Sequence, residues 1–148
     1  MRLWTSAKVV LVFALMGGCA QRLFESRFVV DKGDMLLGES ASVFSQRVGS
    51  YFSNFGMKCS QLANDMGEIN CEEVSGQNLF SKIKILIQID TVTFTVWTLR
   101  NVAWGEVVIP AHESGKRIVF DFIGGTKIIE AYTTIDYGEP IPIEIPLK

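Results

Sequence analysis

The clearest pattern in the chain is an apolar stripe at spacings of three and four residues between residues 39 and 56. Its members are Phe44, Val48, Tyr51, Phe52 and Phe55. This spacing places them on one face of an amphipathic helix, whose aromatic side chains are expected to pack on a hydrophobic core. Ser40 or Ser42 can cap the start of the helix, and Gly56 is a typical C-terminal stop.

From residue 82 onwards, apolar positions alternate with polar ones, which is the period of a half-buried strand. The apolar positions of the first two segments are Ile83, Ile85, Ile87 and Ile89, then Val92, Phe94 and Val96. These segments are expected to pair around Asp90 and Thr91. Further strands are predicted at 106–110, 117–123 and 127–137, with turns at 112–115 and at Gly124-Gly125.

The C-terminal sequence "GEPIPIEIPLK" places isoleucines and a leucine on one parity, and prolines and Glu144 on the other. Because proline has no N–H to donate to the hydrogen bonds between strands, this segment is predicted as an edge strand that resists pairing with another chain.

One helix followed by many strands predicts an α+β fold: an antiparallel meandering sheet with one amphipathic helix packed on a face. The alternative is a β-sandwich with one helix.

The N-terminal segment, residues 1–18, has the layout of a secretory signal: Arg2 and Lys8, an apolar run, then small residues. Its uncharged stretch is too short to cross a bilayer comfortably. The sequence "LMGGC" ending at Cys19 resembles the lipobox of bacterial lipoproteins. That resemblance implies a lipidated Cys19 carrying diacylglycerol and an acyl chain such as palmitate.

The residue after the lipidated cysteine influences sorting in that family, where aspartate tends to retain the protein at the inner membrane. Ala20 stands there, so the resemblance implies a periplasm-facing protein of the outer membrane. Residues 19–27 are expected to form a tether of about 30 Å, and 28–148 a single domain. Cleavage after Ala20 would instead give a soluble periplasmic or secreted protein, and an uncleaved anchor is the third interpretation.

The chain has 3 cysteines, an odd number that leaves one unpaired in an exported protein. If Cys19 carries the lipid, Cys59 and Cys71 remain as a pair. The turn-prone sequence Asn64-Asp65-Met66-Gly67 between them favours a hairpin closed by a disulfide. Free buried thiols or a metal site are the alternatives, and a metal is disfavoured because the only histidine, His112, is distant in sequence.

The charge balance and motifs predict neither nucleic-acid binding nor catalysis. Without the leader, the chain has a net charge of about −4, since 2 of its 14 basic residues and none of its 16 acidic ones lie there. No nucleophile motif or phosphate loop occurs, and His112 is expected in an exposed polar turn. We therefore expect no enzymatic activity, no cofactor and no metal.

The remaining functions are binding functions. The first hypothesis is a structural or adaptor component of a cell-envelope assembly, bound to the bilayer by its lipid and to another envelope protein. Candidate partner-binding residues are the aromatics Trp97, Trp104, Tyr132 and Tyr137. The alternative is an inhibitor or immunity protein that blocks an enzyme or toxin, with residues 111–117 as a projecting loop.

Overall fold

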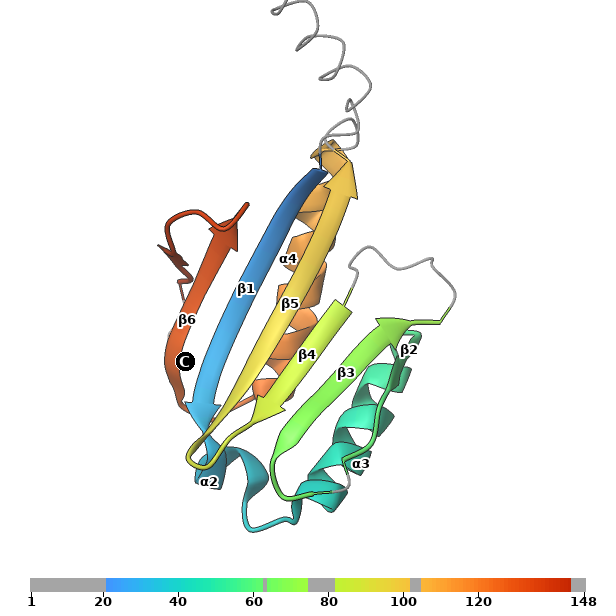
Figure 1. Cartoon of the computed structure of the whole chain (residues 1–148), viewed down its shortest axis with the longest axis vertical. Coiled ribbons are helices and arrows are strands. Elements are labelled where there is room, and N and C mark those ends of the chain that lie inside the picture. Colours follow the sequence, from blue (N-terminus) through green and yellow to red (C-terminus); the bar gives the residue numbers. More distant parts are fainter. Residues whose placement is uncertain (1–20, 63, 75–81, 102–104, 145–148) are drawn as a thin grey trace, which may run out of the picture.

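A computed structural model describes residues 21–62, 64–74, 82–101 and 105–144. These residues form one open antiparallel sheet of seven strands with three helices, an α+β fold (Figure 1). The strands are β1 (Gln21–Asp31), β2 (Met57–Cys59), β3 (Gly67–Glu73), β4 (Lys82–Ile87), β5 (Thr91–Asn101), β6 (Ile128–Ile135) and β7 (Ile141–Pro142). The helices are α2 (Lys32–Leu36), α3 (Ala41–Ser53) and α4 (Gly105–Ile123).

The strand order is β2-β3-β4-β5-β1-β6-β7. Strands β2 to β5 form a meander, and β1 pairs antiparallel with both β5 and β6. The alternating segments behave as their pattern predicts, because β4 and β5 pair with Ile87 opposite Val92. The apolar side chains of both strands are buried up to that turn, whereas Ile89 lies in the turn itself and is exposed.

The predicted amphipathic helix is confirmed as α3. Ser40 caps it, since its hydroxyl accepts a hydrogen bond of 3.1 Å from the Val43 N–H. Phe44, Val48 and Phe52 of the apolar stripe are completely buried. The helix ends at Ser53, three residues before Gly56, which takes a positive φ of 76°.

The expectation of a single helix is wrong, because residues 106–110 and 117–123 belong to one long helix, α4, rather than to two strands. Its buried positions Ala111, Gly115, Val119 and Ile123 recur every four residues, which is a helical spacing. The β-branched residues around them made each half resemble a short strand. Gly124, predicted in a hairpin, instead ends α4 with a φ of 61° and donates to the Phe120 carbonyl.

Helices α3 and α4 pack side by side on one face of the sheet. The Phe122 ring of α4 lies 6.1 Å from the Phe44 ring and 5.6 Å from the Phe52 ring of α3. It also lies 5.8 Å from the Phe94 ring of β5. Two helices and the sheet therefore share one aromatic core.

The expected boundary between tether and domain is also wrong. Residues 21–27 are the first part of β1, which pairs with β5 from Gln21 and with β6 from Phe24, so the folded domain includes Gln21 and does not begin at Phe28. The side chains of Ser26, Phe28 and Val30 are buried, but the polar Ser26 and the apolar Val29 concealed the alternation. Cys19 lies outside the described residues.

Two further predictions concern the edges of the sheet. Cys59 and Cys71 face each other on β2 and β3 and form a disulfide, with 4.0 Å between their Cα atoms. At the opposite edge, β7 pairs with β6 through Ile141 and Pro142. The described part of the C-terminal segment is thus an edge strand, although a short one, and residues 145–148 lie outside the described range.

Candidate functional site

His112 occupies a buried position on α4, with a side chain only 2% exposed, and not the exposed turn that was expected. Its Nε2 lies 2.6 Å from the Ser26 Oγ on β1, and its Nδ1 lies 2.9 Å from the Thr98 Oγ1 on β5. The Ser26 Oγ also lies 2.7 Å from the Thr133 Oγ1 on β6. This His112 cluster connects α4 to three adjacent strands.

Burial, together with the nearby positive charge of Lys116, lowers the pKa of His112 from 6.5 to about 4, and Glu113 opposes the shift. The imidazole is therefore neutral at ordinary pH. One ring nitrogen then donates and the other accepts, and each hydroxyl can take the complementary role. The cluster is thus hydrogen-bonded without any charge in the core.

A serine beside a histidine is the minimal arrangement of a hydrolytic nucleophile and its base. Here the Ser26 side chain is completely buried, so a substrate could not reach its hydroxyl in this conformation. The Thr98 hydroxyl lies at the second ring nitrogen, where a carboxylate orients the histidine in such sites. The geometry therefore favours a role for the cluster in fixing α4 to the sheet.

An open groove of about 670 Å³ lies beside this cluster, between α4 and the β1-β6-β7 side of the sheet. Its apolar lining comes from Phe24, Phe28, Phe120, Ile135, Ile141, Pro142 and Ile143. His112 and Thr133 contribute polar atoms, and the charged lining comes from Glu113, Lys116, Arg117, Asp121 and Glu144. The groove thus combines an apolar floor with charges of both signs.

The groove results from how the helices are placed on the sheet. In Figure 1, α4 lies behind β1, β5 and β4, and α3 lies behind β3 and β2, whereas β6 lies beyond the edge of α4. No helix of the described residues covers the β6-β7 side. Ile141 is consequently 51% exposed, and Phe120 and Ile135 are only half-buried. Apolar side chains that a third helix would cover are left in contact with solvent.

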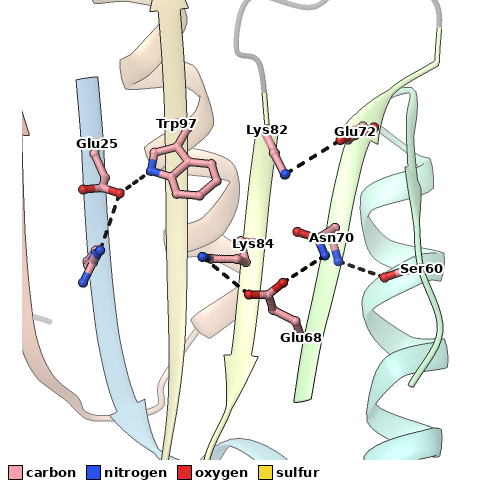
Figure 2. Close-up of polar contacts among 9 residues, drawn as sticks. Glu25, Ser60, Glu68, Asn70, Glu72, Lys82, Lys84 and Trp97 are labelled. Carbon is pink, nitrogen blue, oxygen red and sulfur yellow. Dashed lines mark hydrogen bonds and ion pairs between the residues drawn. The ribbon is translucent and has the colours of Figure 1, made fainter. Parts of the chain in front are cut away.

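The other face of the sheet has no helix of the described residues over it, and it is polar. Figure 2 shows its central contacts: the Trp97 indole N–H donates to Glu25, and Lys84 forms an ion pair of 3.5 Å with Glu68. The Lys84 Nζ also lies 4.7 Å from the centre of the Trp97 ring. In the same region, Lys82 and Glu72 form an ion pair of 3.9 Å.

The predicted aromatic residues do not form one cluster. Trp97 and Tyr132 are both half-buried on the helix-free face, on strands either side of β1. Tyr137 is 82% exposed in the turn after β6. Trp104 lies outside the described residues. The segment 111–117, expected as a projecting inhibitory loop, is part of α4.

The two surfaces differ in what they offer a partner. Both surfaces carry charged groups that are already paired within the chain, Lys84 with Glu68 on the helix-free face and Lys116 with Glu113 at the groove, and surface pairs of this kind contribute little energy. The groove offers apolar area that is not yet buried, which is the more favourable basis for association. The sequence analysis missed the groove because it assigned 106–110 and 117–123 to strands. Phe120 is placed beside the groove only when 105–123 forms one helix.

Comparison with protein-family models, curated proteins and solved structures finds no match to this chain. Among the described residues, no helix has the length and apolar character needed to cross a membrane. Nor do those residues contain a group of three or more potential metal ligands of the His, Cys, Asp or Glu type. The function must therefore be inferred from the chain's own surfaces.

Proposed function

We propose that this chain is a lipid-anchored, periplasm-facing adaptor of the outer membrane, which holds an amphipathic helical segment of another envelope protein in the groove beside α4. The observation that carries this proposal is the uncovered apolar floor of the groove. A helix laid parallel to α4 would complete the helical layer over β6 and β7. Helix-in-groove binding is a recurrent mode of recognition between proteins.

The expected affinity is moderate. Full burial of a large apolar side chain stabilises by about 1.5–3 kcal/mol, so each half-exposed side chain in the groove would contribute about 1 kcal/mol. Phe24, Phe120, Ile135, Ile141 and Ile143 are the residues concerned. The summed burial energy of these side chains is several kilocalories per mole, and the entropic cost of association offsets part of it. Attachment of both proteins to one membrane would raise their effective concentration and support such an interaction.

The charges on the groove rim would select the partner's register. Lys116 and Arg117 lie near the centre of the α4 side of the groove, with Glu113 before them and Asp121 after them, and Lys116 forms an ion pair of 2.7 Å with Glu113. A partner helix that carries acidic residues opposite Arg117 and basic residues near Asp121 would match this order. Because these charges lie at the rim, we expect them to affect specificity and association rate more than affinity.

The anchor is tested by the intact mass of the mature protein extracted from membranes. The proposal predicts diacylglyceryl and acyl groups on Cys19, and their loss in the Cys19→Ser variant. A gain of about two daltons on reduction would report the disulfide between Cys59 and Cys71. An unmodified chain that begins at Gln21 would overturn the lipid anchor.

The adaptor role is tested with two matched isoleucines. Ile141 is 51% exposed and lines the groove, whereas Ile129 is 55% exposed on the neighbouring strand and is not a lining residue. Ile141→Glu and Ile129→Glu therefore add the same charge at similar exposure. We expect one envelope protein to co-purify with the wild type and with Ile129→Glu, and to be lost with Ile141→Glu.

The alternative outcomes of this experiment are also informative. Equal recovery with all three proteins would show that the groove does not bind the partner. If the recovered protein is a toxin or enzyme that the chain inactivates, the chain is an inhibitor and not an adaptor. Thermal unfolding of both variants, followed by circular dichroism, verifies that each remains folded before the comparison.

A further inference from the structure

A second hollow lies on the helix-free face of the sheet, away from the groove. It is open to solvent, has a volume of about 600 Å³ and extends from β2 to the start of β4. Its lining residues are Lys58, Cys59, Ser60, Asn70, Glu72, Glu73, Val74 and Lys82. Ligand sites of this size are usually lined by apolar side chains, whereas most of these are polar or charged. The ligand of this hollow should therefore itself be polar.

The polar side chains of the hollow are held in place but keep the capacity to bind a ligand. The Lys82 Nζ lies 3.9 Å from the Glu72 carboxylate, and the Asn70 Nδ2 lies 3.4 Å from the Glu68 carboxylate (Figure 2). Both distances exceed the length of about 2.7–3.2 Å that is typical of a good hydrogen bond. An ammonium has several donor hydrogens and a carboxylate several acceptor positions. Donors and acceptors thus alternate across the hollow and can still bond to a ligand.

An indole ring lies beside the hollow. Trp97 of β5 is opposite Lys82 of β4, which is opposite Glu72 of β3, so these side chains form one row across the sheet. Figure 2 shows the ring between β5 and β4, with its broad face towards the helix-free side. Its N–H donates to Glu25, which fixes the ring. The face of an indole carries partial negative charge and attracts the C–H groups of a stacked sugar ring.

The charges on this part of the sheet are balanced, which distinguishes between polymeric ligands. The described parts of strands β2 to β5 carry three lysines and three glutamates, namely Lys58, Lys82, Lys84, Glu68, Glu72 and Glu73. A polyanion such as nucleic acid requires an excess of positive charge. A polymer whose substituents carry both carboxylates and amines would instead complement both signs.

The dimensions of the site fit an oligosaccharide better than a single sugar. Ser60 follows β2 and pairs with Asn70 of β3, and Trp97 lies two strands further on. Because neighbouring strands are about 4.8 Å apart, the row from Ser60 to Trp97 spans about 15 Å. A single sugar ring stacked on Trp97 would leave the rest of the hollow empty.

We propose that this hollow and Trp97 form a binding site for a charged cell-wall glycan, meaning a chain of amino sugars whose peptide substituents carry carboxylates and amines. Trp97 stacks on a sugar ring, Lys82 binds a carboxylate, and Glu72 binds an amine or a hydroxyl. The inference goes beyond the proposed function, since it concerns the face opposite the groove and requires neither the lipid nor the helical partner. The chain would then contact a glycan and a protein through different faces.

The test is co-sedimentation of the full-length mature protein with insoluble cell-wall glycan, from which proteins have been removed by hot detergent and protease. We expect the wild type to bind saturably and Trp97→Leu to bind about tenfold more weakly, because the stacking surface is lost. Tyr132→Leu is the matched control. Tyr132 is also half-buried on the helix-free face but lies on β6, two strands beyond β5, so this variant should bind like the wild type.

The charged groups are tested with two double variants that leave the net charge unchanged. Glu72→Gln/Lys82→Gln removes the ion pair of the hollow and should weaken binding several-fold. Glu113→Gln/Lys116→Gln removes an ion pair at the groove and should have no effect. Soluble glycan fragments that carry peptides should compete with the insoluble glycan, and fragments without peptides should compete about tenfold more weakly. Thermal unfolding followed by circular dichroism verifies that each variant is folded.

Each contrary result would overturn a defined part of the proposal. A wild type that does not sediment, or sediments only with glycan that retains its proteins, would overturn glycan binding. Equal losses with Trp97→Leu and Tyr132→Leu would overturn the location of the site. Equal competition by fragments without peptides would overturn the assignment to a charged glycan. The groove variant Ile141→Glu should keep its glycan binding, so failure of this proposal and failure of the proposed function are distinguishable.

Discussion

Lowering the pH below 6.5 should destabilise the folded domain through His112. In the folded state its pKa is about 4, whereas an unfolded chain has the ordinary value near 6.5. Between these values the unfolded state binds a proton that the folded state does not bind. The free energy of unfolding therefore falls as the pH falls through this range, and it is fully retained above pH 6.5.

The magnitude follows from the separation of the two pKa values, which corresponds to about 3 kcal/mol over the whole range and about 2 kcal/mol at pH 5. The structure gives the physical cause. Ser26, Thr98 and the Phe24 ring face the imidazole from the sheet, and none of them carries a negative charge. Of the charged groups on α4, Lys116 opposes protonation and Glu113 favours it.

The assay is urea unfolding at several pH values between 7 and 4, with the disulfide intact. His112→Gln is the control, because glutamine keeps a donor and an acceptor but does not titrate. Carboxylates titrate in both proteins, so the difference between their pH slopes isolates the histidine. Equal slopes would refute the reasoning and would mean that His112 is not buried as a neutral ring.

Three further predictions concern stability and can be measured by urea unfolding. Replacing both Cys59 and Cys71 with alanine should cost about 3 kcal/mol, since they close a loop across 12 positions; an unchanged midpoint would contradict this. Ser40→Ala should cost about 1 kcal/mol by removing the cap of α3, whereas Ser42→Ala, at an exposed position, should have almost no effect. Gly124→Ala should cost about 1 kcal/mol because of its φ of 61°, whereas Gly125→Ala, where an added Cβ meets open space, should be nearly neutral; equal costs for the two glycines would contradict the assigned helix end.

The predictions that proved correct rest on patterns within a single segment of the sequence. The stripe from Phe44 to Phe55 has only a helical interpretation, and the isoleucines of β4 have only a strand interpretation. Cysteine counting indicated the disulfide because Cys59 and Cys71 flank a turn-prone sequence. In each case the local period or spacing is enough to determine the structure.

The predictions that proved wrong concern features that are determined by contacts between segments distant in sequence. The residues of α4 are rich in β-branched side chains and include Pro110, so each half resembles a strand until the burial of Ala111 and Val119 on one face is seen. The burial of His112 depends on hydroxyls from three strands that are distant in sequence. The groove depends on the absence, among the described residues, of a helix over β6, which no local pattern reveals.

The central claim is that the groove beside α4 holds a helical segment of another envelope protein. Its most direct test is photo-crosslinking in intact cells, with a photoreactive phenylalanine at Ile141 and, as control, at Ile129. The account predicts a cross-linked product from Ile141 alone, and the captured peptide should belong to an amphipathic helix. Equal products from both positions, or capture of a segment without an apolar face, would contradict it.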